Sequence, residues 1–243
     1  MNTSIIVRED SAQIVELTAQ KLVDAARNSI AARGVFTLAL AGGSTPRALY
    51  GLLASEAYRD RFDWEKIHIF FGDDRAVPPT DELSNFKMAT DTLLSLVPLP
   101  PQNIHRMETE RDDLESAAND YEAQLAPFGA LDVVLLGMGD DGHTASLFPY
   151  SPALGEEKKL CVATPVASLQ PYVRRLTLTY PAINAARHVW ILVTGEGKAP
   201  RLAQVISGQS SIEETPISGV QPENGELVWM VDSGAASLLQ LAN

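Results

Sequence analysis

The sequence has little of what builds disulfide frameworks, cysteine metal clusters or membrane spans. Its 243 residues include one cysteine, which excludes an intramolecular disulfide and a metal site made of several cysteines. That residue, Cys161, sits in the apolar run LCVATPV, so we expect it to be buried as a small hydrophobic side chain. No stretch approaches the roughly 20 apolar residues that a membrane helix requires. The opening segment MNTSIIVREDSAQ lacks the basic and apolar regions of a signal peptide, and we expect a cytoplasmic protein.

Positive charge is also scarce. The chain has 31 acidic and 19 basic residues, giving a formal net charge of −12. Nucleic acids and anionic membranes attract proteins of the opposite sign, so we expect neither as a partner. A few arginines can still form a local positive pocket for a small anionic ligand. A monomer and a small homo-oligomer both stay open.

Short apolar runs alternate with helix-like stretches along almost the whole chain. The runs occupy 35–41, 67–71, 131–137, 175–180, 188–195 and 227–231. A first helix, capped by Asp10 or Ser11 and closed by Gly34, precedes further helices near 46–54, 85–96, 112–126, 197–207 and 233–241. This alternation predicts an α/β fold with a doubly wound, mostly parallel, Rossmann-like sheet and helices on both faces. We expect one domain covering 1–243.

The segments that follow the apolar runs are the candidate site, because ligands of such folds bind at the carboxyl ends of strands. The first of these segments is GGSTP (42–46). Gly43 allows close backbone approach, Ser44 and Thr45 offer hydroxyl groups, and a helix begins there, which together favour an anion cradle. An ordinary strand–helix turn would use the same residues. The segment is neither a Walker loop nor a GxGxxG fingerprint, so it does not support a nucleotide site.

Two acids and an arginine follow the run at 67–71, in the segment GDDRAVPP. Asp73 or Asp74 is a candidate carboxylate at the end of the strand, and Arg75 is a candidate for holding an anionic oxygen. Asn85 begins the next helical stretch, from which its side chain can reach the same cleft. A solvated turn is the competing interpretation.

A glycine-rich loop with a histidine, GMGDDGHTASLFP, follows the run at 131–137. Such a loop is costly to order, which favours a functional role for His143. Asp141 precedes it by two residues and is placed to hold the imidazole tautomer. The pair favours activation of water, and its spacing offers no second ligand for zinc. The other three histidines, His68, His105 and His188, are expected to be structural or at the surface.

Positive charge is supplied by two later segments. Arg174 and Arg175 begin the run RLTLTY, and strand alternation directs them to opposite sides. The alternation does not decide which of the two faces the site, and Arg175, which leads the pattern R-L-T-L-T most directly, is the first choice. Lys198 follows TGEG near a helix N-terminus, where its charge is unfavourable unless an anion lies between them.

In their order and spacing, GGSTP, FGDDRAVP, GMGDDGHTASLFP, RLTLTYPAIN and TGEGKA resemble the 6-phosphogluconolactonases over roughly residues 35–200. That family shares the doubly wound fold and is related to glucosamine-6-phosphate deaminases/isomerases. The resemblance implies hydrolysis of 6-phospho-D-glucono-1,5-lactone in the oxidative pentose phosphate pathway, with a phosphorylated sugar lactone as small-molecule partner. It implies no metal and no redox cofactor.

The resemblance also implies roles for the residues singled out above. His143 would be the general base, Asp141 would orient it, and Asp73 with Arg75 would lie against the sugar ring and its oxyanion. The implied phosphate-binding set is Gly43, Ser44, Thr45, Arg175 or Arg174, and Lys198, with Asn85 beside it. The role of Arg47, one residue past the GGSTP motif, stays open.

Two alternatives compete with the lactonase hypothesis. The related deaminases carry an aromatic residue after the acidic pair, where this chain has Arg75, and a glutamate where it has Phe148 before Pro149. A non-catalytic sugar-phosphate sensor of the same fold would need a DNA-binding module, and only about ten residues precede the first helix. Retention of both His143 and Asp141 also favours chemistry over sensing.

Overall fold

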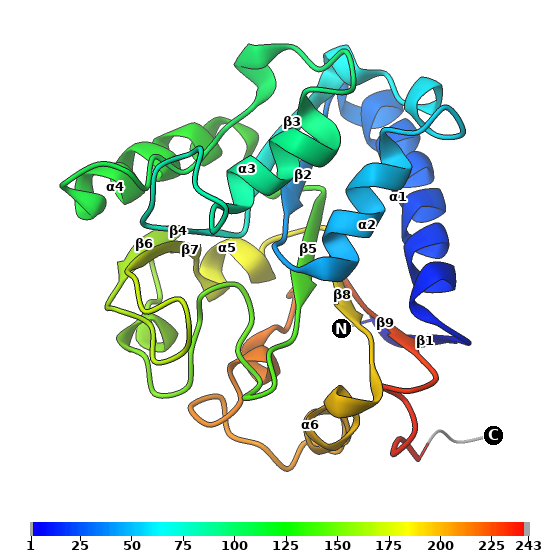
Figure 1. Ribbon diagram of the computed structural model, residues 1–243, viewed down its shortest axis with the longest axis vertical. Helices are drawn as coiled ribbons and strands as arrows, with labels where there is room; N and C mark the ends of the chain where they lie inside the picture. The colour runs from blue at the N-terminus through cyan, green and yellow to red at the C-terminus, as the bar shows by residue number, and fades with distance from the viewer. Residues whose placement is uncertain (1, 241–243) are drawn as a thin grey trace.

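The computed structural model describes residues 2–240, which form two sheets (Figure 1). The larger sheet has six parallel strands in the order β1-β9-β8-β5-β2-β3. These strands are β1 (Asn2–Arg8), β2 (Phe36–Leu40), β3 (Ile67–Phe71), β5 (Val133–Gly137), β8 (His188–Val193) and β9 (Glu226–Asp232). The parallel sheet with its flanking helices confirms the predicted α/β fold class.

The chain order of the strands reverses between β2 and β5. The next strand of the larger sheet along the chain, β3, pairs with one side of β2, whereas β5, β8 and β9 extend from the other side. Loops diverge at such a switch point, so a crevice opens at the carboxyl ends of the strands. Every residue of β2 and most of β5 are buried, as expected for strands covered on both faces.

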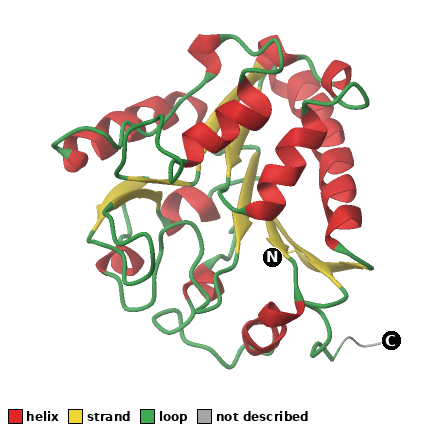
Figure 2. Cartoon of the chain, in the orientation of Figure 1, coloured by secondary structure: helices red, strands yellow, loops and turns green. Residues whose placement is uncertain are grey.

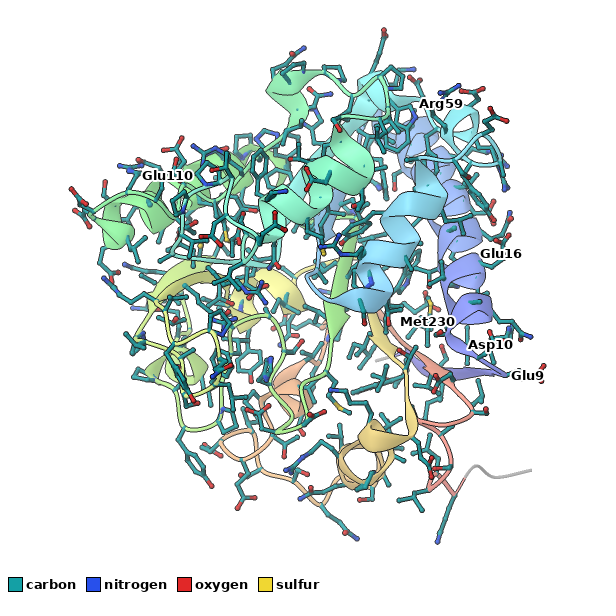
Figure 3. All side chains as sticks on the ribbon, viewed as in Figure 1. Glu9, Asp10, Glu16, Arg59, Glu110 and Met230 are labelled. Atoms are coloured by element: carbon teal, nitrogen blue, oxygen red, sulfur yellow. The ribbon has the colours of Figure 1, made fainter. Side chains whose placement is uncertain are left out.

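The helices lie on both sides of the larger sheet. They are α1 (Ser11–Arg33), α2 (Ser44–Leu53), α3 (Asn85–Ala89), α4 (Leu114–Leu125), α5 (Tyr180–Asn184) and α6 (Ala199–Ile206). Figures 1 and 2 show α1 and α2 to the right of β5 and α5 with the second sheet to its left. As predicted, α1 is capped by the carboxylate of Asp10, which accepts a hydrogen bond from the Gln13 N–H at 2.9 Å (Figure 3).

A second, antiparallel sheet corrects one sequence prediction. Its strands are β4 (Asp73–Arg75), β7 (Arg175–Leu178) and β6 (Cys161–Thr164), in the order β4-β7-β6. The run at 175–180, which we grouped with the strands of a mostly parallel sheet, therefore lies outside the larger sheet and pairs antiparallel with both neighbours. Its apolar pattern fits a buried strand of either kind, so the pattern alone did not distinguish them. Cys161 is fully buried, as expected.

The predicted helix at 233–241 is also wrong for residues 233–240, of which 233–238 form turns and none is helical, while residue 241 lies outside the described residues. The carboxylate of Asp232 accepts hydrogen bonds from the backbone N–H groups of Gly195 and Ala235, which turns the chain at the end of β9. A helix this short has little stability of its own, so these tertiary contacts decide the conformation. The predicted stretch 85–96 begins as α3 and continues as a π-helical turn over Thr90–Leu94.

Residues of both sheets share one apolar core. The cluster includes Val134 and Ile191 of the larger sheet with Leu176 and Leu178 of β7, all of them buried. Across residues 2–240 no helix is both long enough and apolar enough to cross a membrane.

Candidate active site

A cleft of about 320 Å³ lies at the carboxyl ends of the parallel strands, next to β4 and β7. It is formed by the loops after β2, β5 and β8 together with the two strands of the second sheet. The sequence-predicted residues that line it are Gly43, Ser44, Thr45, Asp73, Arg75, Asn85, His143, Arg175 and Lys198. Segments that are distant in the sequence therefore meet in one place.

His143 and Asp141 form a hydrogen-bonded pair at this cleft. The Nδ1 atom of His143 lies 2.6 Å from an Asp141 carboxylate oxygen, which also accepts the His143 backbone N–H at 3.0 Å. Burial opposes ionisation of Asp141, but the hydrogen bonds and charge of His143 outweigh it and lower the pKa of Asp141. No hydrogen bond within residues 2–240 engages Nε2 of His143, which leaves that nitrogen for a ligand or water.

The histidine loop has no space for a side chain at Gly139. A Cβ atom at position 139 would lie 2.1 Å from Nδ1 of His143 and 2.7 Å from a carboxylate oxygen of Asp141. Any other residue would therefore displace the pair. The Gly139 N–H also donates to the His143 carbonyl at 2.8 Å, closing the loop around the histidine.

Asp73 and Asp74 have different surroundings. Asp73 lines the cleft, and its carboxylate accepts hydrogen bonds from Ser146 Oγ at 2.5 Å and Asn85 Nδ2 at 3.1 Å. The carboxylate of Asp74 instead accepts the backbone N–H groups of Arg75, Asn85 and Phe86 and thereby anchors the start of α3. Burial raises the pKa of Asp74, although these three donors oppose it. Of the two acids, only Asp73 is therefore a cleft residue.

Arg75 and Arg175 face each other across the β4–β7 pair, where they are register partners. Like charges in this arrangement repel, and both guanidinium groups line the cleft. The Nε atoms of both are buried and have no hydrogen-bond partner within the described residues 2–240. Burial lowers the pKa of Arg175, opposed by the charge of Asp73 at 3.9 Å and assisted by that of Arg75. Anionic oxygens of a ligand beside the two guanidinium groups would offset the repulsion between them.

Arg174 lies outside the cleft, which corrects its inclusion among the candidates. Its guanidinium donates to Glu115 at 3.1 Å and to the Thr164 carbonyl at 3.2 Å, and its side chain is 42% exposed. Alternation along β7 directs it away from Arg175, whose side chain is 4% exposed. Arg47 is exposed on α2 and does not line the cleft either.

The GGSTP segment places the N-terminus of α2 at the cleft. Gly43 precedes the helix with φ +104°, a conformation that side chains rarely adopt, and Ser44 and Thr45 form its first turn. The N–H groups of a first helical turn have no partner within the helix. Thr45 Oγ is held by the hydroxyl of Thr194 at 2.8 Å. Lys198 Nζ reaches the cleft from the loop after β8 and lies 2.5 Å from Asp140.

Two residues of the cleft region, Ser146 and Thr194, were not predicted from the sequence, and Phe148 was noted only as a difference from the deaminases. Ser146 donates to Asp73, Thr194 holds Thr45, and the ring of Phe148 packs against His143. Ser146 and Phe148 belong to the TASLFP segment beside the histidine loop, so proximity to His143 was the available signal. Thr194 carried no such signal. The described residues contain no cluster of three or more histidine, cysteine or acidic side chains suited to a metal ion.

The fold and the cleft define an α/β protein with a histidine–aspartate pair and cationic side chains at the carboxyl edge of its sheet. The sequence model of the glucosamine-6-phosphate isomerases/6-phosphogluconolactonase family matches residues 9–229. This chain belongs to that family.

Individual relatives agree with this assignment. A 6-phosphogluconolactonase of Synechocystis is 42% identical over 220 residues, covering 87% of this chain and 88% of the relative. A 6-phosphogluconolactonase of Mycobacterium tuberculosis is 38% identical over 250 residues, covering 98% of this chain and 99% of the relative. The crystal structure of a 6-phosphogluconolactonase from Thermotoga maritima has a TM-score of 0.84 at 30% identity, covering 95% of this chain and 100% of that chain.

Proposed function

We propose that this protein hydrolyses 6-phospho-D-glucono-1,5-lactone to 6-phospho-D-gluconate. The observation that carries the proposal is the meeting of a His143–Asp141 pair with two guanidinium groups, Arg75 and Arg175, in one cleft. Hydrolysis of an ester needs an activated water and a donor for the developing oxyanion. The similarity to proteins named 6-phosphogluconolactonase supports the same substrate.

His143 acts as the general base. Asp141 holds Nδ1, so Nε2 accepts a proton from a water molecule while the water oxygen attacks C1 of the lactone. The carbonyl oxygen becomes an oxyanion in the tetrahedral intermediate. The bond between C1 and the ring oxygen then breaks, and the imidazolium returns its proton to that oxygen. One water is consumed, and the product is the open-chain acid.

The cationic side chains bind the anionic oxygens of the substrate. We assign the phosphate to the start of α2, with Ser44 and Thr45, and to Lys198 and Arg175, since N–H groups, hydroxyls and positive charge converge there. Arg75 is assigned to the oxyanion. The carboxylate of Asp73 already accepts two hydrogen bonds, so we assign it the task of holding Arg175 and the sugar ring in place.

A deaminase of amino-sugar phosphates is the less supported alternative. The position before Pro149 is Phe148, which is 5% exposed and packs on His143, so no carboxylate is present there for ring opening. Arg75 follows the acidic pair, and its guanidinium lines the cleft.

The test measures two reactions with the same wild-type protein. The lactone is generated in situ from glucose 6-phosphate at neutral pH with EDTA present, and its spontaneous hydrolysis is subtracted. We expect fast hydrolysis of the lactone and no release of ammonia from glucosamine 6-phosphate. Release of ammonia without acceleration of lactone hydrolysis would replace the proposal by the deaminase. Binding of sugar phosphate with neither reaction would favour a sensor.

We further propose that the chain works as one domain, because residues of both sheets share one apolar core. The cytoplasm is the proposed compartment, because one cysteine offers no intramolecular disulfide for an oxidising environment.

A further inference from the structure

Phe148 contacts both halves of the proposed machinery. Its ring centroid lies 4.6 Å from that of His143, with 35° between the ring planes, and 5.1 Å from the Cζ atom of Arg175. The side chain is 5% exposed. One aromatic ring therefore touches the side chain assigned to activate water and a side chain assigned to hold the anionic substrate.

The backbone of His143 is held by hydrogen bonds to Asp141 and Gly139, but its imidazole makes one hydrogen bond within residues 2–240, at Nδ1. The hydrogen bond from Nδ1 to Asp141 fixes the distance of that nitrogen, but the ring can still pivot about it. A flat apolar surface packed against the imidazole removes the pivoting motion and fixes the direction of Nε2.

Arg175 is held by few strong polar contacts. Its nearest carboxylate, Asp73, lies at 3.9 Å, and its best hydrogen bond, to the Pro171 carbonyl, is 3.4 Å long. The Nε atom has no partner within residues 2–240. A cation over an aromatic face is attracted by the ring without using any N–H donor, so the Phe148 ring can locate the guanidinium and leave its donors for the ligand.

We propose that Phe148 is a positioning residue that sets the orientation of the His143 imidazole and the Arg175 guanidinium together. This inference rests on the proposed function for its kinetic consequences. An aliphatic side chain of similar size would fill the space but would provide neither the flat surface nor the attraction for the cation.

The test compares three variants of the full-length protein. We expect Phe148→Leu to lower kcat about 10-fold, since misplacing a reacting group by a fraction of an ångström is enough for this, and to raise KM several-fold. Phe148→Tyr keeps the aromatic face, so its kcat and KM should both stay close to the wild-type values. The matched control is Phe128→Leu, because Phe128 also packs on a histidine, His68, at 4.7 Å but outside the cleft. It should leave kcat and KM unchanged.

Two further readouts separate positioning from loss of stability. In the His143→Ala background, Phe148→Leu should lower kcat no further, because the group that it positions is gone. In otherwise wild-type protein, Phe148→Leu should shift the NMR titration of the His143 imidazole and weaken binding of 6-phosphogluconate several-fold. A Phe148→Leu protein that loses only thermal stability, with kcat, KM, titration and binding as in wild type, would overturn the inference. If wild type itself does not hydrolyse the lactone, the proposed function fails, and titration and binding alone decide the role of Phe148.

Discussion

Both ends of the parallel sheet bury a carboxylate beside arginines, but within residues 2–240 the buried arginine N–H groups that lack a partner lie at the cleft end. Asp132, at the amino end of β5, is 2% exposed and forms an ion pair with Arg187 Nε at 3.2 Å. Its carboxylate also accepts hydrogen bonds from a guanidinium N–H of Arg33 and from the Thr37 N–H at 2.9 Å. At the carboxyl end, Asp73 lies 3.9 Å from Arg175, whose Nε has no partner within the described residues.

This difference indicates what each cluster does. The Asp132 cluster pairs its buried charge with groups of the same chain, so its contribution is to the stability of the fold. In the cleft, Arg75 lies opposite Arg175, and the Nε atoms of both have no partner within residues 2–240. This arrangement adds little to the stability of the fold, but it is suited to binding an anion. We therefore expect removal of the Asp132 charge to lower the stability of the fold without changing activity, and removal of the Arg175 charge to weaken ligand binding with little change in stability.

The largest effect is expected at the proposed base. His143→Ala should lower kcat for the lactone about 10²-fold or more, because water then loses its proton acceptor, while affinity for 6-phosphogluconate changes little. The measurement is steady-state hydrolysis with the spontaneous rate subtracted. His188→Ala is the control, since His188 also pairs with a carboxylate, Glu226 at 3.2 Å, but outside the cleft. Turnover close to wild type in His143→Ala would remove His143 from the mechanism.

The next effect separates stability from activity. Asp132→Asn should lower the free energy of unfolding by about 2 kcal/mol, because the buried carboxylate loses its charge-assisted hydrogen bonds to Thr37 and Arg33, while the exposed Arg33 and Arg187 stay hydrated. Urea unfolding measures it, and kcat and KM should stay at wild-type values. A loss of activity in the folded variant would contradict the separation of the two ends.

Removal of a cleft charge should weaken ligand binding and leave the stability of the fold nearly unchanged. Arg175→Met should raise KM for the lactone and Kd for 6-phosphogluconate about 10-fold or more, since charge-assisted hydrogen bonds to the ligand are lost. The free energy of unfolding should change little, because relief of the repulsion with Arg75 and removal of an unpartnered donor offset the loss of the contacts with Asp73 and Phe148. Arg174→Met is the neighbouring control and should alter neither constant. A strongly destabilised Arg175→Met protein with unchanged Kd would assign Arg175 to the fold.

The smallest effect concerns a pair of histidines at the edge strand β3. His68 Nδ1 lies 2.9 Å from His105 Nε2, and burial lowers the pKa of both. The folded protein therefore binds protons less readily than the unfolded chain, whose histidines titrate near ~6.5, so stability is complete above that pH and falls below it. Urea unfolding at about pH 7.5 and about pH 5.5 measures the loss. His105→Gln should show a smaller difference between the two conditions, and an equal difference would exclude the pair as its source.

The parallel sheet and much of the cleft could be predicted from the sequence, because continuous apolar runs mark buried strands and ligand loops follow such strands. His143, Asp141 and Arg75 stood out as chemistry-bearing residues in loops of that kind. Each lies at or beside the cleft.

The rest depended on contacts between distant segments. The strand β1 at Asn2–Arg8 exists because it pairs with β9 at the other end of the chain. Assignment of Arg175–Leu178 to the second sheet required its pairing with Asp73–Arg75, about a hundred residues away. The choice between Asp73 and Asp74 likewise depended on the hydrogen bonds from Asn85 and Phe86 to Asp74. Such pairings between distant segments produce no periodic pattern in the local sequence, so the sequence does not predict them.

The contrast between the two ends is tested most directly by thermal unfolding with and without 6-phosphogluconate, measured on wild type, Asp132→Asn and Arg175→Met. A ligand that binds only the folded state raises Tm according to its affinity. We predict that 6-phosphogluconate raises the Tm of wild type and, from a lower starting value, that of Asp132→Asn by a similar amount, and that the increase is clearly smaller in Arg175→Met. An equal increase in Arg175→Met, or no increase in wild type, would contradict it.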